Sequence, residues 1–340
     1  MTYCDVMILG FGGVGQAFAQ ILNDQEKAEE GLRYRVVAIS DLHQGWAYNE
    51  QGLDLALLLD KETRPMQMQS FDIDPEDQTL ALIRDSKLDV MVEATYTTHD
   101  GQPAIAYFRE ALSNGIHIVT TNKGPVALAS KELEQLAKDN SVSLMVEGTV
   151  MSGTPVITVL DNIVDTTRVT KIRGIFNGTC NYILTQMRAG MSYQEALEQA
   201  QSLGFAEADP KNDVEGWDVA LKMLILSNRY MKTDFSLDDI RPKGIDQLSI
   251  EDVNNATADG KRWRLIGQIV QQEKNIIISI QPELLSEDDP LFFIDGAINA
   301  VNVECGYLGS FTVSGPGAGL LETGYALWAD MNVAVTGEKG

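Results

Sequence analysis

Short apolar runs alternate with amphipathic segments over the first 150 residues. Runs rich in Val, Ile and Met predict buried strands, and apolar residues at helical spacing between them predict helices. The expected strands are CDVMIL, YRVVAISD, LDVMVEAT, GIHIVTTN and VSLMVEGTV. The expected helices are the segment from the first strand as far as NDQEKAEEGL, then PAIAYFREALSNG and SKELEQLAKDN. Strands that alternate with helices predict an α/β fold, with a parallel sheet covered on both faces.

A glycine motif, GFGGVG, follows the first apolar run. Gly10, Gly12 and Gly15 form G-x-G-x-x-G between an expected strand and an expected helix, the context in which this motif binds a dinucleotide. The first glycine permits a tight turn, the second lets a pyrophosphate approach the backbone, and the third lets helix and strand pack closely. A bare tight turn is the alternative, but the surrounding strands and helices favour a Rossmann domain that binds its cofactor at a helix N-terminus.

The second expected strand, YRVVAISD, ends at Asp41, where an acid that binds the cofactor's ribose is expected. A carboxylate accepts hydrogen bonds from a ribose 2′-OH but repels a 2′-phosphate. No Arg or Lys adjoins Asp41 in SDLHQG, although His43 could partly offset the repulsion of a 2′-phosphate by the carboxylate. We therefore expect NAD to be favoured, with NADP as the alternative.

The composition of the 340-residue chain narrows its function classes. Hydrophobic content of 44% and charged content of 22% are typical of a soluble globular protein. The net charge of −23 argues against nucleic acid or membrane as partners, and no apolar run approaches the roughly 20 residues of a membrane span. Cys4, Cys180 and Cys305 lack the spacing of a disulfide framework or zinc site. We expect a cytoplasmic location.

Dehydrogenase chemistry needs a group that exchanges a proton with the substrate's oxygen. His43, His99 and His117 have no supporting constellation, so a structural role is favoured for each. Lys123 in TTNKGP follows the C-terminal end of an expected strand, where ligands approach an open parallel sheet. An ordinary loop lysine is the equally weighted alternative.

A second lysine lies in an apolar helix expected from residue 214 to about 229, with Asp213 as its N-cap. Asp218 and Lys222 are four residues apart, on the same face. A buried lysine needs a partner, and its ammonium loses a proton more easily as water is removed. Glu207 adds a further carboxylate. A purely structural ion pair is the alternative for Asp218 and Lys222.

Six segments, in the same order, resemble the homoserine dehydrogenase family over nearly the whole chain. They are GFGGVG, VTTNKGPVAL, EGTVMSGTPVI, RGIFNGTCNYILTQM, GFAEADPKNDVEGWDVALKMLIL and SGPGAGLLETGYALWADM. The short form of the family, without a regulatory domain of the ACT type, is the closer match. The turn EGTVMSG departs from the family's usual pattern at Met151 and Ser152, which bears on cation binding more than on catalysis.

The resemblance implies a role for each matching residue. Lys222 is the acid/base for the substrate's C4 oxygen and acts with Asp218 and Lys123, while Glu207 and Asp218 hold the substrate's ammonium group. Lys123 is shared by substrate and cofactor. The other implied contacts are Gly178 and Thr179 for the amino acid; Gly10, Phe11, Gly12, Gly13, Val14, Gly15, Asp41, Thr95 and Gly319 for NAD or NADP; and Glu147, Val150, Ser152 and Thr154 for a monovalent cation, Na⁺ or K⁺, held largely by carbonyl oxygens.

The resemblance also implies a domain plan. A Rossmann domain with a doubly wound parallel sheet spans residues 1–150, and a mixed α+β domain for substrate binding and dimerisation spans 151–313. A C-terminal segment, 314–340, packs back on the cofactor domain.

The implied enzyme is a homodimer that interconverts L-aspartate 4-semialdehyde and L-homoserine, in threonine and methionine synthesis. The alternatives are a related dehydrogenase of another small hydroxy-amino acid or hydroxy acid, and a dinucleotide sensor without turnover. Cys180, next to Thr179, raises the further idea of a cysteine nucleophile. Because no histidine lies near Cys180 in the sequence, a packing role is favoured for it.

Overall fold

The computed structural model describes residues 3–25, 33–164, 166–273 and 275–337. The chain divides into two compact units. The first comprises Met1–Gly153 and Gly319–Gly340, and the second comprises Thr154–Ala318.

The first unit contains a six-stranded sheet in the order β3-β2-β1-β4-β5-β6. All neighbouring strands are parallel except β2 and β3, which pair antiparallel at one edge. This order is that of a dinucleotide-binding α/β sheet, and the predicted fold class is confirmed. The strands are β1 (Tyr3–Leu9), β2 (Arg33–Asp41), β3 (Gly45–Tyr48), β4 (Val90–Glu93), β5 (His117–Thr120) and β6 (Leu144–Met145).

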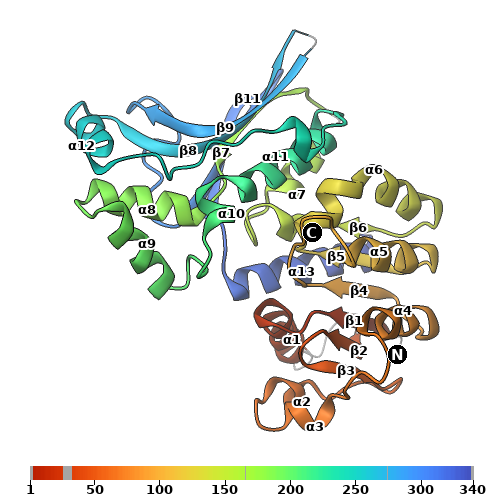
Figure 1. Ribbon diagram of the computed structural model, residues 1–340. Coiled ribbons are helices and arrows are strands. Elements are labelled where there is room, and N and C mark those ends of the chain that lie inside the picture. Colours follow the sequence, from red (N-terminus) through yellow and green to blue (C-terminus); the bar gives the residue numbers. More distant parts are fainter. Residues whose placement is uncertain (1–2, 26–32, 165, 274, 338–340) are drawn as a thin grey trace. The chain divides into compact units, whose positions relative to one another are not determined.

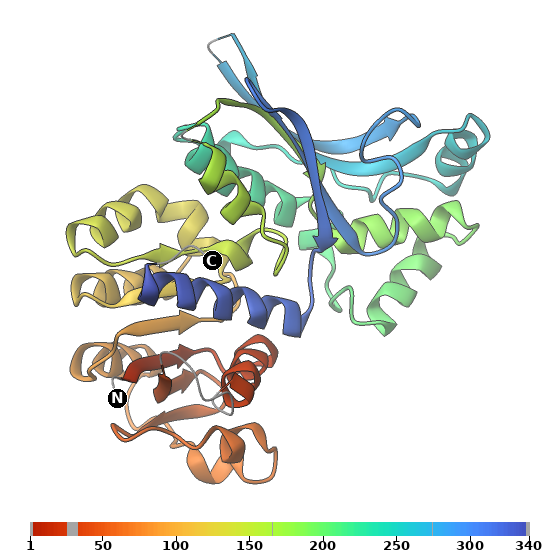
Figure 2. The same cartoon turned by 180° about the vertical axis from the view of Figure 1, so that it is seen from behind.

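Helices cover both faces of this sheet (Figure 1). Alternate residues of β1 enter different cores: Val6 and Ile8 pack with Phe18, whereas Met7 packs with Phe108. The helix α13, near the C-terminus, lies against α1 (Figure 2). The helices are α1 (Gly13–Gln25), α2 (Leu55–Leu59), α3 (Arg64–Gln67), α4 (Pro75–Asp85), α5 (Ala104–Ser113), α6 (Lys123–Asp139), the 3₁₀ helix η1 (Glu147–Thr149) and α13 (Leu320–Thr336).

The predicted domain boundaries differ by a few residues from the limits of the two units. The first predicted helix is described as far as Gln25, where α1 ends. The predicted continuation, residues 26–32, lies outside the described residues. The first unit continues past residue 150, because the Ser152 hydroxyl lies 2.7 Å from the Thr323 hydroxyl of α13. The C-terminal segment begins at Gly319 rather than Ser314, because residues up to Pro316 still belong to a strand of the second unit.

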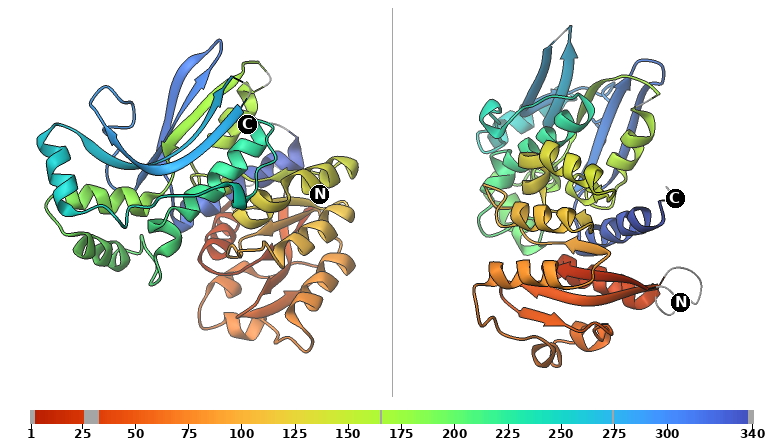
Figure 3. Two further views of the ribbon diagram at one scale, coloured as in Figure 1. Left: turned by 45° about the horizontal axis from the view of Figure 1, so that its top comes forward. Right: turned by 90° about the vertical axis from the view of Figure 1, so that its right-hand side faces the viewer.

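The second unit is built on a five-stranded antiparallel sheet in the order β11-β10-β7-β8-β9. The long strands β8 and β9 pair along their whole length (Figure 3). The strands are β7 (Val169–Ile175), β8 (Arg262–Gln272), β9 (Asn275–Leu285), β10 (Ile298–Cys305) and β11 (Gly309–Pro316).

Helices α8, α11 and α12 pack on the sheet of the second unit, which gives the mixed α+β architecture that was predicted. None of the helices in the described part of the chain has both the length and the apolar character that a membrane crossing needs. The helices are α7 (Val156–Ile163), α8 (Gly178–Arg188), α9 (Tyr193–Ser202), α10 (Lys211–Val214), α11 (Trp217–Tyr230), the 3₁₀ helix η2 (Leu237–Asp239) and α12 (Ile250–Ala258).

The apolar helix predicted from residue 214 is in fact two helices. Asp213 lies inside the short helix α10 and is therefore not an N-cap. Gly216 follows with a φ of 89°, a left-handed conformation that only glycine adopts readily, and α11 begins at Trp217. The prediction missed this break because the pattern of apolar residues continues across it.

Candidate active site

The glycine motif lies between β1 and α1, as predicted, but its glycines have different neighbours. Gly10 has a φ of 86°, and a Cβ there would lie 2.8 Å from the Ala94 carbonyl carbon. A Cβ on Gly15 would lie 2.1 Å from the Gly10 carbonyl oxygen. A Cβ on Gly12, in contrast, would meet no atom within 4 Å. Gly10 and Gly15 are therefore required by packing, whereas Gly12 borders the open space that a pyrophosphate needs.

Asp41, at the end of β2, contacts the glycine loop directly. Its Oδ2 accepts a hydrogen bond of 2.7 Å from the backbone N–H of Phe11. Its Oδ1 accepts hydrogen bonds of 2.9 Å from the backbone N–H groups of His43 and Gln44. The structure thus places the predicted ribose-binding acid beside the loop, which Gly13 and Val14 continue into the first turn of α1.

Sequence reasoning missed Arg64, a cation that the fold brings to the same loop. Arg64 is the first residue of α3, and its guanidinium lies 5.5 Å from the centre of the Phe11 ring. It donates hydrogen bonds to the Gln16 and Gln44 side chains and to two backbone carbonyls at the end of α2. No local pattern marks Arg64, because the fold alone brings it near the strand that ends in Asp41.

A buried glutamate organises the carboxyl ends of β4 and β5. Glu93 accepts hydrogen bonds from the Thr120 hydroxyl at 2.6 Å, from the Asn122 amide at 3.3 Å, and from both the backbone and the hydroxyl of Thr95. Burial raises the pKa of Glu93, and these donors oppose that rise. Thr95, a predicted nucleotide contact, is thereby fixed close to Gly10.

Lys123 begins a helix, so it is not the ordinary loop lysine that was the alternative to a functional role. Asn122 caps α6 by accepting a hydrogen bond from the Gly124 N–H, and Lys123 is the first residue of the helix. Its backbone N–H donates to the Thr97 hydroxyl at 3.3 Å. A lysine at the positive end of a helix dipole favours an anionic ligand.

Three of the four residues predicted to bind the cation, Glu147, Val150 and Ser152, belong to the first unit. Glu147 opens η1 and is buried, and Val150 follows that helix directly. Ser152 has a φ of 55°, a left-handed backbone conformation that is uncommon for residues other than glycine. Thr154 is the first residue of the second unit. Within the described residues, no group of three or more His, Cys, Asp and Glu residues could hold a metal ion.

Gly319, another predicted cofactor contact, lies in the first unit. It is the N-cap of α13 and has a φ of 137°. A Cβ at this position would lie 2.0 Å from a carboxylate oxygen of Glu322. Gly319 and the glycine motif belong to the same unit.

Lys222 and Asp218 form a buried pair in the second unit. The Lys222 side chain is 7% exposed, and its Nζ donates 2.6 Å hydrogen bonds to Asp218 Oδ2 and to the Phe176 carbonyl. The Asn177 amide also donates to Asp218 Oδ2, at 2.9 Å, and to Asp213 Oδ1, at 2.6 Å. The pair predicted from helix spacing exists, but Asn177, which joins both carboxylates, was missed.

The residues predicted to bind the amino acid lie around the start of α8. Asn177 is the N-cap of that helix, and Gly178 and Thr179 form its first turn. The Thr179 hydroxyl donates to the Phe205 carbonyl, which fixes the loop that leads to Glu207. Glu207 itself is exposed, and its backbone carbonyl accepts a hydrogen bond from Gln201. The structure therefore joins Asp218 and Lys222 to the α8 N-terminus, and leaves the Glu207 side chain at the surface.

Cys180 packs inside the second unit. It is 0% exposed, and its Sγ donates to the Asp213 carbonyl at 3.2 Å. Burial, together with the nearby Asp213 and Asp218 carboxylates, raises the pKa of the Cys180 thiol well above its usual value. A thiol that keeps its proton is a poor nucleophile, which agrees with the packing role inferred from the sequence.

Models of one protein family match both units. The model described as "Homoserine dehydrogenase, NAD binding domain" matches residues 10–147, and the model described as "Homoserine dehydrogenase" matches residues 155–331. Among curated proteins, the chain is 43% identical over 339 residues to the NAD(+)-dependent homoserine dehydrogenase of Pseudomonas canavaninivorans, covering 97% of this chain and 96% of that protein. It is 35% identical to the homoserine dehydrogenase of Methanocaldococcus jannaschii, covering 96% and 97%.

Solved structures of homoserine dehydrogenases are also similar to this chain. A homoserine dehydrogenase from Thiobacillus denitrificans is 30% identical with a TM-score of 0.82, covering 97% of this chain and 73% of that one. A hyperthermophilic archaeal homoserine dehydrogenase in complex with NADPH is 28% identical with a TM-score of 0.81, covering 100% and 99%.

Proposed function

This chain belongs to the homoserine dehydrogenase family and is an NAD(P)-dependent oxidoreductase, and we propose that Lys222 is its acid/base. The reaction interconverts L-homoserine and L-aspartate 4-semialdehyde. One observation carries the proposal: the Lys222 ammonium is buried, and a carboxylate and a backbone carbonyl hold it in one position. A fixed ammonium away from bulk water is well suited to proton exchange with a substrate oxygen.

The chemistry divides between the cofactor and the side chains. NAD(P)H supplies the hydride when bound, and the open space beside Gly12 with the acid Asp41 fits a dinucleotide. As the C4 aldehyde is reduced, Lys222 Nζ donates a proton to the oxygen that becomes the alcohol. In the reverse direction the neutral amine accepts that proton. Asp218 holds Nζ in place through a contact of 2.6 Å.

The substrate's charged groups are assigned to the residues around α8. Asp218 and Glu207 hold the ammonium group, and the first turn of α8, at Gly178 and Thr179, receives the carboxylate, because a helix N-terminus favours a negative charge. Lys123 binds both cofactor and substrate. Glu207 is exposed, so its side chain can change rotamer at little cost.

The function is tested by following NADH and NADPH oxidation with a panel of small aldehydes. L-aspartate 4-semialdehyde is expected to give the highest kcat/KM. A higher value with an aldehyde that lacks the ammonium group would contradict the substrate assignment and favour a hydroxy-acid dehydrogenase. Cofactor binding without turnover of any aldehyde would favour a dinucleotide sensor.

We expect NAD to be used at least as well as NADP. The Asp41 carboxylate would repel a 2′-phosphate, and Arg64, the nearby cation, already donates to four acceptors. Asp41→Asn keeps the shape of the side chain and removes its charge, so it should shift the preference towards NADP. The measurement is kcat/KM with each cofactor. A wild-type preference for NADP of more than about tenfold, equivalent to about 1.4 kcal/mol, would overturn this expectation.

The turn around Glu147, Val150, Ser152 and Thr154 is proposed to bind Na⁺ or K⁺ through backbone oxygens. The Ser152 hydroxyl is engaged with Thr323, which supports a carbonyl rather than a side-chain ligand at this position. Ser152→Ala is therefore expected to retain the cation. Crystals of wild type and variant soaked in rubidium would reveal the coordination shell by anomalous scattering. A well-ordered wild-type turn without a cation, or a shell of side chains only, would refute the proposal.

Two further expectations concern the intact protein. The second unit is proposed to form a homodimer, which light scattering of the purified enzyme would test, since a monomer mass at micromolar concentration would exclude it. The cytoplasmic location is supported by three free thiols, Cys4, Cys180 and Cys305, and cell fractionation would test it.

A further inference from the structure

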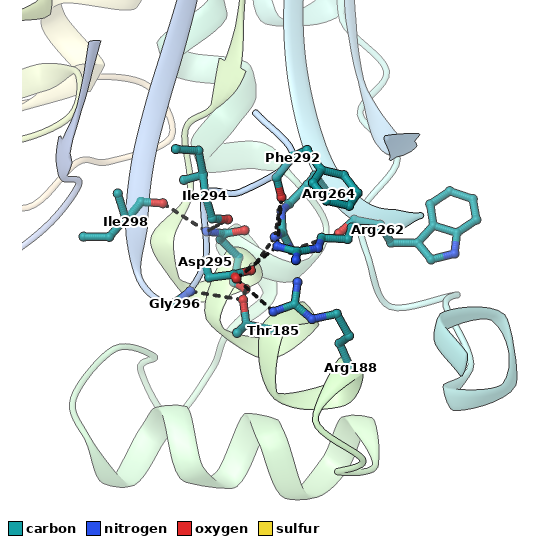
Figure 4. A network of polar contacts seen from close by, with 11 residues as sticks. Thr185, Arg188, Arg262, Arg264, Phe292, Ile294, Asp295, Gly296 and Ile298 are labelled. Carbon is teal, nitrogen blue, oxygen red and sulfur yellow. Dashed lines mark hydrogen bonds and ion pairs between the residues drawn. The ribbon is translucent and has the colours of Figure 1, made fainter. Parts of the chain in front are cut away.

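Three arginines of the second unit converge on one carboxylate (Figure 4). Arg188, near the end of α8, donates to Asp295 Oδ2 at 2.9 Å, and Arg262 of β8 donates to the same oxygen at 3.1 Å. Arg264, also of β8, donates to Asp295 Oδ1 at 2.5 Å. With three guanidinium groups and one carboxylate, the cluster carries an excess of two positive charges, in a chain whose net charge is −23.

The excess charge is unusual because part of the cluster is buried. The Arg264 side chain is 1% exposed, and burial together with repulsion from Arg188 and Arg262 lowers the pKa of Arg264 to about 10. The Phe292 carbonyl accepts hydrogen bonds from Arg262 and Arg264 but adds no negative charge. Burying unbalanced charge is costly, so a further counter-charge would stabilise the cluster.

Two nitrogen atoms of the cluster are left without an acceptor. Nε of Arg264 and Nη1 of Arg188 are buried and make no hydrogen bond within the described residues. Buried donors are rarely unsatisfied in proteins, and each such group calls for a water or ion. The cluster is also reachable from solvent, because the side chains of Asp295, Arg188 and Arg262 are 38%, 22% and 21% exposed.

We propose that the cluster of Arg188, Arg262, Arg264 and Asp295 binds a small oxyanion of the phosphate type, at a site separate from the catalytic pair. Guanidinium groups bind phosphate and carboxylate oxygens through paired N–H donors, and two or more of them around one anion form a strong site. Asp295 keeps the three arginines close together, and the anion supplies the missing negative charge.

The location suggests what binding does. Three residues on α8 form polar contacts with the segment just before β10. Asn181 donates to the Ile294 carbonyl, and Thr185 accepts from the Gly296 N–H. Arg188 pairs with Asp295. An oxyanion between Arg188 and the arginines of β8 would fasten this helix to the sheet. Binding is therefore expected to stabilise the second unit.

The test is thermal unfolding of the NADH-saturated enzyme in increasing sodium phosphate, with sodium chloride at matched ionic strength as the reference. Saturating NADH occupies the glycine loop, so phosphate cannot act there. We expect phosphate, and also sulfate, to raise Tm while chloride at the same ionic strength does not. Arg188→Gln should raise the half-saturating phosphate concentration about tenfold, which corresponds to the loss of one charge-assisted hydrogen bond.

Arg229→Gln is the matched control. Arg229 has similar exposure, forms an ion pair with Asp161 in the same unit and does not belong to the cluster, so this variant should keep the wild-type response to phosphate. If Arg188→Gln does not fold, Arg262→Gln tests the same cluster. The proposal is overturned if phosphate acts no better than chloride, or if the variants at Arg188 and Arg262 respond as Arg229→Gln does.

Discussion

Lys222→Met is expected to lower turnover by about 10²–10⁴, the usual contribution of a general acid–base group, while NADH affinity stays close to wild type. Reduction of an aldehyde generates negative charge on oxygen, and in the proposed mechanism the Lys222 ammonium both stabilises that charge and supplies the proton. Methionine retains most of the volume of the side chain, so packing around the buried position should survive. Turnover, substrate saturation and NADH affinity measured on folded enzyme provide the test.

Removal of Lys222 also affects its partner. Asp218 would lose the ammonium at 2.6 Å but keep the hydrogen bond from Asn177, so a moderate loss of stability is expected. Asp218→Asn offers the contrast, because it should weaken substrate binding together with turnover, whereas Lys222→Met should act mainly on kcat. A Lys222→Met enzyme with turnover within about threefold of wild type would make the lysine a structural ion-pair residue.

The pairing of Lys222 with Asp218 could be predicted from the sequence alone, because the two residues are only four positions apart on one helix. A spacing of four residues on a helix places two side chains on one face, whatever the rest of the fold does. The same holds for the glycine motif and for the alternation of strands and helices in the first unit, both of which are patterns within short segments. The family resemblance then supplied the roles that the local patterns left open.

The residues that were missed owe their positions to contacts between distant segments. Arg64 reaches Phe11 and Gln44 only when the fold brings α3 close to the glycine loop and to the turn after β2. Asn177 joins Asp213 of α10 to Asp218 of α11. Charge and polarity in the sequence do not reveal such partners.

Two substitutions within the glycine motif are expected to separate folding from cofactor binding. Gly15→Ala places a Cβ 2.1 Å from the Gly10 carbonyl oxygen, where backbone must move, and should lower the free energy of unfolding by about 3 kcal/mol, towards the upper end for overpacking. Gly12→Ala meets no atom within 4 Å and should leave stability unchanged.

For NADH binding, in contrast to stability, Gly12→Ala is expected to have a large effect. A methyl group at position 12 enters the open space that the pyrophosphate needs, so Gly12→Ala should weaken NADH binding by about tenfold or more, without a matching loss of stability. Denaturant unfolding without cofactor and fluorescence titration with NADH measure the two effects separately. A Gly12→Ala variant with wild-type NADH affinity would mean that the pyrophosphate does not approach the backbone at this glycine. A Gly15→Ala variant as stable as wild type would mean that α1 can move away from β1 at no cost, contrary to the close packing of the two elements.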